Sequence, residues 1–240
     1  MIRDRWRNIR AAIKQDIESG VLEPGTKLPT EPELAQAYGA GRHSIRRAVI
    51  ELGKEGLLSV EQGRGTFVQS RPRLTYTIGP RTRMRRNMTA QGVDVTGERL
   101  WAETCAASPR IAKALALDEG REVIATRRRS FANDVPVSFG TIYHEAARFA
   151  EFSDRREIMG SVSAVYASYG IEDYKRASTQ IHARPARADE AQMLNQHPDM
   201  PVIVVQAIDA DLGGAPIAYS EVIWSAARVT FDISNMETDP

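Results

Sequence analysis

The first 70 residues combine three helical patterns with a glycine-rich hairpin, and few folds accommodate that order. An amphipathic helix is predicted over residues 3–19, because apolar residues recur there every three or four positions. Shorter helices are predicted over about 31–38 and 42–55, and the first of them opens with a capping-box pattern. Two short strands around a glycine-rich turn follow within residues 58–68. This order predicts a helix-turn-helix with a β wing, which is a DNA-binding arrangement.

The third predicted helix begins with basic and polar residues that suit contacts to DNA. In a helix-turn-helix this helix enters the major groove and presents its N-terminal side chains to base edges. Arg42 and Arg46 lie four positions apart, so they share one face, and a guanidinium group can bind guanine with two hydrogen bonds. The candidate DNA contacts are Arg42, His43, Ser44, Arg46 and Arg47 in the helix, and Gly63 and Arg64 in the wing. The alternative is that these arginines form a solvated face.

Helices and hairpins alternate through the rest of the chain, which predicts a second domain of the α+β class around an antiparallel sheet. Helices are predicted over about 109–117, 155–169 and 188–195. Paired strands are predicted over 121–131 with 135–143, and over 202–212 with 216–224. The predicted division is a winged helix-turn-helix domain over 1–70, a linker over 71–78 and a second domain over 79–240.

The N-terminal pattern resembles the winged-helix domain of the GntR family of bacterial transcription regulators. The resemblance rests on Leu28-Pro29, Glu33-Leu34-Ala35, Gly39, Arg42, Arg46, Leu52, Glu55-Gly56-Leu57-Leu58 and the wing from Gly63 to Val68. It implies DNA contacts at Arg42, Ser44, Arg46 and the region of Gly63. Pro32 stands where many relatives have an arginine that touches DNA, and Gly41 stands where serine or threonine is common. These departures imply one lost contact and a weaker helix cap.

The second half resembles the effector-binding UTRA domain of the HutC branch of that family, whose fold is related to chorismate lyase. The resemblance covers about residues 77–235 and rests on the runs Arg127–Ser138 and Tyr219–Arg228. Ala227 stands where relatives have aspartate, which removes a local partner for Arg228. Within the branch, the sequences GPRTRM and YHEAARF are most similar to the phosphonate-metabolism (PhnF-type) regulators. The resemblance implies that residues 79–240 form a domain for effector binding and dimerisation.

Four arginines fall within residues 79–87, where a helix is predicted from Thr82 to about Gln91. The Thr82 hydroxyl, the backbone N–H groups after it and nearby guanidinium groups are expected to converge on an anion. Residues 127 and 129 point to the same face of one strand and are expected to complete the site. The candidate effector contacts are Arg81, Thr82, Arg83, Arg127, Arg129, Tyr143, Tyr174, Tyr219 and Glu221, the last suited to a ligand amine. The alternatives are a solvated basic surface and contacts to DNA phosphates beside the linker.

The composition argues against several other classes of protein. Cys105 is the only cysteine, so no disulfide can form within the chain, and a reducing compartment is expected. The chain shows neither a signal peptide nor an apolar run of membrane-spanning length, so a cytoplasmic protein is expected. Residues 1–75 carry 13 basic and 9 acidic side chains, whereas residues 91–240 carry 15 basic and 22 acidic ones. This asymmetry favours a polyanionic partner for the N-terminal part.

Together these patterns predict a homodimeric transcription regulator that binds a double-stranded DNA operator and acts as a repressor released by a small anionic effector. The effector is expected to be a phosphonate or a phosphate-like metabolite. Three alternatives are open: the same type of regulator with a histidine, amino-sugar or other metabolite effector, a DNA binder without a ligand, and an enzyme with a DNA-binding appendage. The sequence carries no metal-ligand cluster, Walker loop or nucleophile motif, so no catalytic residue, metal or cofactor is expected.

Overall fold

The computed structural model describes residues 5–61, 63–69, 73–81 and 83–233 of the 240-residue chain. Its backbone contacts divide into two compact units. The first unit comprises Met1–Leu74, Ala183–Val202 and Ser225–Thr230. The second comprises Thr75–His182, Ile203–Trp224 and Phe231–Pro240.

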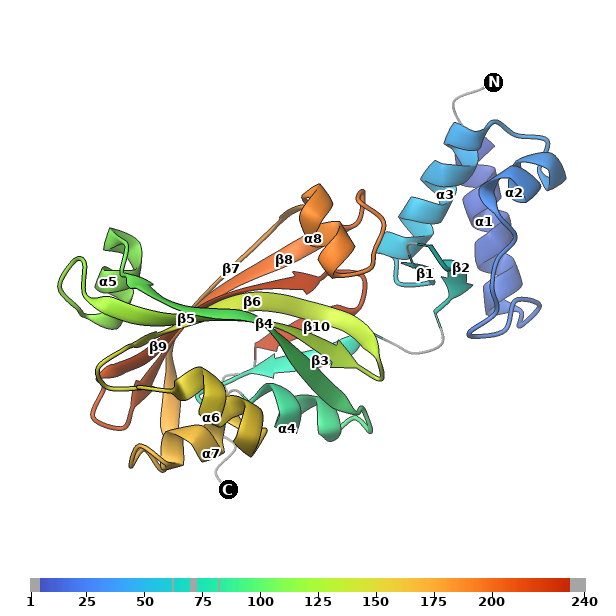
Figure 1. Cartoon of the computed structure of the whole chain (residues 1–240). Helices are drawn as coiled ribbons and strands as arrows, with labels where there is room; N and C mark the ends of the chain where they lie inside the picture. The colour runs from blue at the N-terminus through green and yellow to red at the C-terminus, as the bar shows by residue number, and fades with distance from the viewer. Residues whose placement is uncertain (1–4, 62, 70–72, 82, 234–240) are drawn as a thin grey trace. The chain divides into compact units, whose positions relative to one another are not determined.

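The first unit opens with three helices and a hairpin, in the order that the sequence predicts. The helices are α1 (Arg5–Glu18), α2 (Glu31–Ala37) and α3 (Arg42–Lys54), and the antiparallel strands are β1 (Leu58–Glu61) and β2 (Gly65–Val68) (Figure 1). Glu33 accepts hydrogen bonds from the backbone N–H and the hydroxyl of Thr30, at 2.7 and 2.8 Å, at the start of α2. Gly63 and Gly65 have φ values of +77° and +123°, so the turn of the hairpin requires residues without a Cβ atom.

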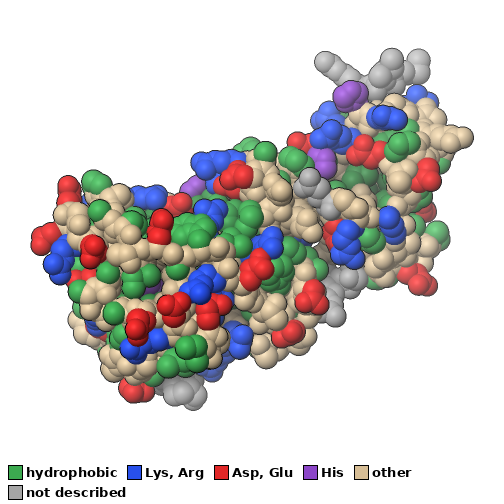
Figure 2. Space-filling view, in the orientation of Figure 1, with side chains coloured by type: hydrophobic (Ala, Val, Ile, Leu, Met, Phe, Trp, Pro, Cys, Tyr) green, Lys and Arg blue, Asp and Glu red, His purple; other side chains and the backbone are tan. Residues whose placement is uncertain are grey.

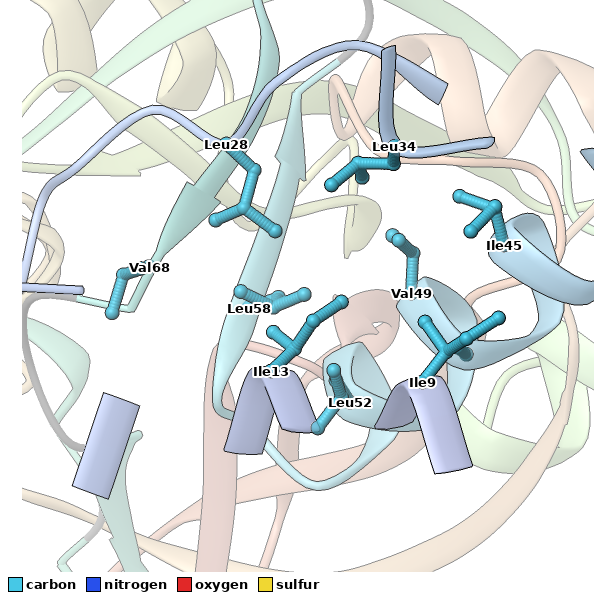
Figure 3. Packing of buried hydrophobic residues seen from close by; sticks show 10 residues of the cluster. Ile9, Ile13, Leu28, Leu34, Ile45, Val49, Leu52, Leu58 and Val68 are labelled. Carbon is cyan, nitrogen blue, oxygen red and sulfur yellow. The ribbon is translucent and has the colours of Figure 1, made fainter. Parts of the chain in front are cut away.

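One apolar core holds these elements together (Figure 3). Its largest contributions come from α1 and α3, through side chains that are at most 4% exposed: Ile9, Ile13, Ile45, Val49 and Leu52. Leu34 of α2 and Leu58 of β1 close the core from the other sides. Because α3 buries one stripe of apolar residues in this way, its opposite face remains in solvent.

Six strands form one sheet in the order β4-β5-β6-β9-β8-β7. They are β4 (Val95–Ala106), β5 (Glu122–Ala132), β6 (Val135–Glu145), β7 (Tyr174–Pro185), β8 (Pro201–Asp211) and β9 (Pro216–Ser225). The remaining elements are α4 (Met84–Thr89), α5 (Pro109–Leu115), α6 (Phe152–Met159), α7 (Val162–Ala167), α8 (Ala188–Met193), β3 (Leu74–Ile78) and β10 (Val229–Ile233). In Figure 1, α4, α6 and α7 all lie below the sheet. This is the predicted α+β arrangement.

The segment predicted as a linker, residues 71–78, contains strand β3, which pairs with β10. Tyr76 and Ile78 are each 7% exposed, and the apolar residues at alternate positions explain why this stretch forms a strand rather than a tether. The linker assignment is therefore corrected for residues 74–78. Strands β4 and β7, at the two edges of the sheet, were not expected from the sequence.

Two helical predictions are also corrected. The helix predicted over 155–169 is divided into α6 and α7, because Gly160 adopts a φ of +66° and Ser161 caps the second helix. The helix predicted from Thr82 begins instead at Met84, and Arg83 is its N-cap residue. Thr82 itself lies outside the described residues.

Arg228 follows Ala227, so the preceding residue offers it no carboxylate. Its guanidinium group donates hydrogen bonds to the backbone carbonyls of Leu194 and Asn195. Burial lowers the pKa of Arg228 to about 10. Backbone carbonyl oxygen atoms thus accept these two hydrogen bonds, because the Ala227 side chain has no carboxylate.

Aromatic rings pack around a buried histidine in the second unit. His144 is fully buried, and its ring centroid lies 3.7 Å from that of Phe152 in a stacked arrangement. The Nε2 atom of His144 lies 2.9 Å from the hydroxyl of Tyr166. Burial lowers the pKa of His144 to about 3, so the imidazole is neutral in the folded protein at neutral pH.

We expect the free energy of unfolding to fall as the pH is lowered from 7 to 5, in part because of His144. In this range the unfolded chain binds a proton at this histidine, whose pKa there is about 6.5, whereas the folded protein does not. The resulting loss at pH 5 is about 2 kcal/mol, and it levels off below the folded-state pKa. Urea denaturation of the parent and of His144→Gln at both pH values measures the difference.

A second histidine with a lowered pKa would add to the pH dependence, so it should be replaced in both proteins. Burial also lowers the pKa of His197, so both proteins should carry His197→Gln. The same pH dependence with and without His144 contradicts the prediction.

Leu52→Ala should destabilise the helical core of the first unit by about 2–5 kcal/mol, because the side chain is fully buried and its removal leaves a cavity. Hydrogen exchange of the α1 and α3 amide groups in the full chain measures this local loss of stability. Val21→Ala is the matched control, since Val21 is 74% exposed and should change the stability by less than about 0.5 kcal/mol. Equal protection in the parent and Leu52→Ala contradicts the assignment of the core.

Candidate functional site

Helix α3 separates packing residues from polar residues. Ile45, Val49 and Leu52 are buried in the core of the first unit. The predicted DNA contacts at the start of the helix remain accessible: Arg42, His43, Arg46 and Arg47 are exposed, and Ser44 is half-buried. The geometry therefore leaves a basic face at the N-terminal half of α3, where a helix-turn-helix presents its side chains to base edges.

Local contacts position some of these basic residues. The guanidinium carbon of Arg47 lies 4.3 Å from the ring centroid of Trp6 in α1, so Arg47 stacks on the neighbouring helix. In the wing, exposed Arg64 forms an ion pair with Glu61, and Gly63 has open space beside its Cα atom. Gly41 is the N-cap of α3 and has no side chain to cap it, as the departure from the family pattern implies.

A cavity of about 930 Å³ lies in the second unit, on the side of the sheet where α4, α6 and α7 pack. Strands β5, β6 and β9 form its floor with side chains from one face of the sheet, including Thr126, Arg128, Ile142, Ser220 and Val222. The walls come from α4, α6, α7 and β7. This volume lies within the usual range for small-molecule sites.

The described residues that line this cavity include six arginines and a single acidic side chain, Asp209. The arginines are Arg83, Arg85, Arg86, Arg128, Arg156 and Arg176. The face of the molecule drawn in Figure 2 shows no such excess of basic side chains, because blue and red side chains are interspersed over much of it. The strong positive bias is thus a property of the cavity.

Two of these arginines are held in place by carboxylates, one from outside the cavity lining and one from within it. Arg128 pairs with Glu157, and its Nη2 atom donates to the carbonyl of Gly97 at 3.2 Å. Arg176 Nε lies 2.6 Å from Asp209 Oδ1. These bonds fix the side chains without removing them from the cavity wall.

Three buried polar atoms of cavity residues have no hydrogen-bond partner among the described residues: Thr126 Oγ1, His144 Nδ1 and Arg156 Nε. Burial and the neighbouring charges of Arg128 and Arg85 lower the pKa of Arg156 to about 10. An unsatisfied buried donor and a repelled cation are both costly in a folded protein. An anionic ligand would relieve both costs at Arg156.

The structure brings Arg81 and Arg83 together, as expected, but through a protein carboxylate. Arg81 Nε lies 2.8 Å and Arg83 Nη2 lies 3.3 Å from oxygen atoms of Asp173. The Arg83 guanidinium also lies 3.3 Å from the ring centroid of Tyr174, and both of these residues line the cavity. Arg81 is not among the lining residues.

The other expected effector residues lie on the opposite face of the sheet. The guanidinium of Arg127 lies 5.1 Å from the ring centroid of Phe139, and Arg129 Nε lies 2.7 Å from Glu98. Tyr143 stacks with Tyr219 near α5, at 6.0 Å between centroids. Glu221 pairs with Arg110 at 2.8 Å. The expected grouping of these five residues, Arg127, Arg129, Tyr143, Tyr219 and Glu221, with Arg83 is therefore corrected, because alternate side chains of a strand point to opposite faces.

Sequence reasoning missed Arg128, Arg156, Arg176 and Asp209. The period of two in the strand indicates that Arg128 faces away from its neighbours, but it does not indicate which face is covered by helices. Arg156 and Arg176 are far apart in the sequence and carry no motif of their own. Arg85 and Arg86 belong to the arginine-rich stretch and could have been included on that ground.

Among the helices of the described residues, none is long and apolar enough to cross a membrane.

Comparison with known proteins identifies both parts of the chain. Residues 6–68 match the model of the bacterial regulatory proteins of the gntR family, and residues 90–230 match the UTRA domain. The HTH-type transcriptional regulator RB1450 of Rhizobium meliloti is 35% identical, over 95% of this chain and 93% of its own length. The probable transcriptional regulator PhnF of Escherichia coli is 28% identical, over 96% of this chain and 95% of its own.

The fold agrees with a solved structure of the same kind. The crystal structure of PhnF from Mycobacterium smegmatis has a TM-score of 0.66 and 23% identity, covering 96% of this chain and all of that chain. The matched domains and relatives are transcription regulators, not enzymes. The chain therefore belongs to the GntR family of transcription regulators, in the group that combines a helix-turn-helix domain with a UTRA effector domain.

Proposed function

We propose that the protein is a transcriptional repressor whose affinity for its DNA operator falls when a small anion occupies the arginine-lined cavity. The single observation that carries the effector part of this proposal is the composition of that cavity, with six arginines and one carboxylate among its described lining residues. Guanidinium groups match the oxygen atoms of phosphate and phosphonate groups. The proposed anion contacts are Arg85, Arg128 and Arg156, and Arg83 lines the same cavity.

The names of relatives support the repressor role. NagR of Bacillus subtilis, 24% identical over 94% of this chain and 92% of its own length, is described as a transcriptional repressor. A relative from Klebsiella aerogenes, 27% identical over 84% of this chain and 82% of its own length, is described as the histidine utilization repressor. The second name also refers to histidine utilization, so the choice of a phosphonate or phosphate-like effector rests on the cavity and on the similarity to PhnF.

The DNA part of the proposal assigns base contacts to Arg42 and Arg46 on the exposed face of α3. A homodimer acting in the cytoplasm would present two such helices to the two halves of a palindromic operator. An effector changes operator affinity only if it binds one arrangement of the dimer more tightly, and such coupling is typically about 1–3 kcal/mol.

Arg42→Ala and Arg46→Ala should each weaken operator binding by about 5- to 150-fold, which corresponds to about 1–3 kcal/mol for one lost base contact. The probe is a double-stranded fragment that the parent protein selects from a random pool, and the measurement is fluorescence anisotropy at fixed salt. Arg121→Ala is the control, because Arg121 is an exposed arginine of the second unit. If both α3 variants bind the operator with the parental affinity, the assignment of base contacts to Arg42 and Arg46 is wrong.

Ethylphosphonate and inorganic phosphate should each raise the Tm of the parent protein, because a ligand of the folded state stabilises it. Arg128→Gln should abolish or strongly reduce this rise. Arg129→Gln is a matched control on the opposite face of the same strand, and it should respond as the parent does. If the two variants respond alike, the cavity is not the anion site.

Arg156→Gln gives a second test, whose expected result differs from the lower Tm that a folding defect would cause. Removing a partly buried cation that is repelled by Arg128 and Arg85 should leave the Tm without ligand unchanged or higher, while the rise on adding anion is lost. A lower Tm without ligand, combined with a parental response to the anion, contradicts the proposal.

A further inference from the structure

The charged groups of the arginine-lined cavity lie in two clusters. The first contains Arg128 on β5 together with Arg85 and Arg156 from the helices that cover this face. The second contains Arg176 on β7 and Asp209 on β8, beside Arg83 and Tyr174. Strands β6 and β9 lie between β5 and β8, so three strand spacings, or about 14 Å, separate the backbone that carries Arg128 from the backbone that carries Asp209.

Asp209 is the unusual member of this lining. It is the one acidic side chain among the described residues of the cavity wall, and its side chain is 20% exposed. Arg176 occupies its Oδ1 atom at 2.6 Å. A carboxylate can accept further hydrogen bonds, so Asp209 can also receive a donor from a molecule in the cavity.

The floor between the clusters suits a short chain rather than a second anion. Ile142, Ser220 and Val222 carry neutral side chains there, and the hydroxyl oxygen of Thr126, on the same strand as Arg128, has no hydrogen-bond partner among the described residues. A ligand that lies along this floor reaches arginines alone at one end, and at the other end a carboxylate that is paired with Arg176.

We propose that the effector is a zwitterion, with an anionic phosphonate or phosphate group at Arg85, Arg128 and Arg156 and an ammonium group that donates to Asp209. This inference rests on the proposed function, because it assumes that the cavity binds an anion. It adds the second recognition point, which selects amino-substituted anions over plain ones.

The test compares two ligand series on the full-length protein by isothermal titration calorimetry. One series contains plain alkylphosphonates from ethyl to hexyl, and the other contains the ω-aminoalkylphosphonates of the same lengths. We expect the amino compound to bind about tenfold more tightly than its plain partner at one or more chain lengths. Asp209→Asn should remove this preference and leave the affinity for the plain compounds unchanged or higher, because it removes a negative charge from the cavity. Asp118→Asn, at an exposed acidic residue outside the cavity, should retain it.

Each outcome has a distinct meaning. Equal or weaker binding of the amino compounds to the parent overturns the zwitterion inference and leaves the proposed anion site in place. A preference that survives in Asp209→Asn assigns the ammonium contact elsewhere and also overturns the inference. If neither series nor inorganic phosphate binds the parent, the proposed function itself fails. The ligand series on the parent keeps the inference testable if Asp209→Asn does not fold.

Discussion

The alternation of side chains along β5 is the constraint on which the chemistry of the second unit depends. Arg128 points into the cavity, whereas Arg127 and Arg129 point to the opposite face and find Phe139 and Glu98 there. The antiparallel register of β5 with β6, and of β6 with β9, carries this division across the sheet. A shift by one residue would exchange the two faces and remove the cavity's central arginine.

The cavity combines a high positive charge with the partial burial of Arg128, Arg156 and Arg176, and these two properties oppose each other. Burial penalises the charge of Arg156, and the nearby charges of Arg128 and Arg85 add repulsion. Such an arrangement is costly without a counter-ion and becomes favourable when one is present. The same physics that weakens the empty site thus strengthens the proposed site when an anion enters, which links occupancy to the stability of the helices around it.

The first unit uses a similar division between two faces, on a helix rather than a sheet. The helical period places Ile45, Val49 and Leu52 in the core and leaves Arg42 and Arg46 accessible. Because packing holds the buried stripe, the helix presents its basic residues on a rigid support. This is why the same short segment predicts both the fold of the domain and its DNA-facing surface.

The sequence by itself determined the elements with a strong local period: helices α1, α2 and α3, the wing hairpin, and the hairpins β5–β6 and β8–β9. It did not reveal β4 and β7, because most of their residues are exposed and they lack the alternation that marks a half-buried strand. It also identified the arginine-rich stretch but selected the face of β5 that lies opposite to the cavity. Only the tertiary structure decided that choice, since the two faces of a strand become different only when helices from distant parts of the chain cover one of them. The same covering brought Arg156 to Arg128, and the sheet placed Arg176 on the wall of the same cavity, which no spacing in the sequence indicates.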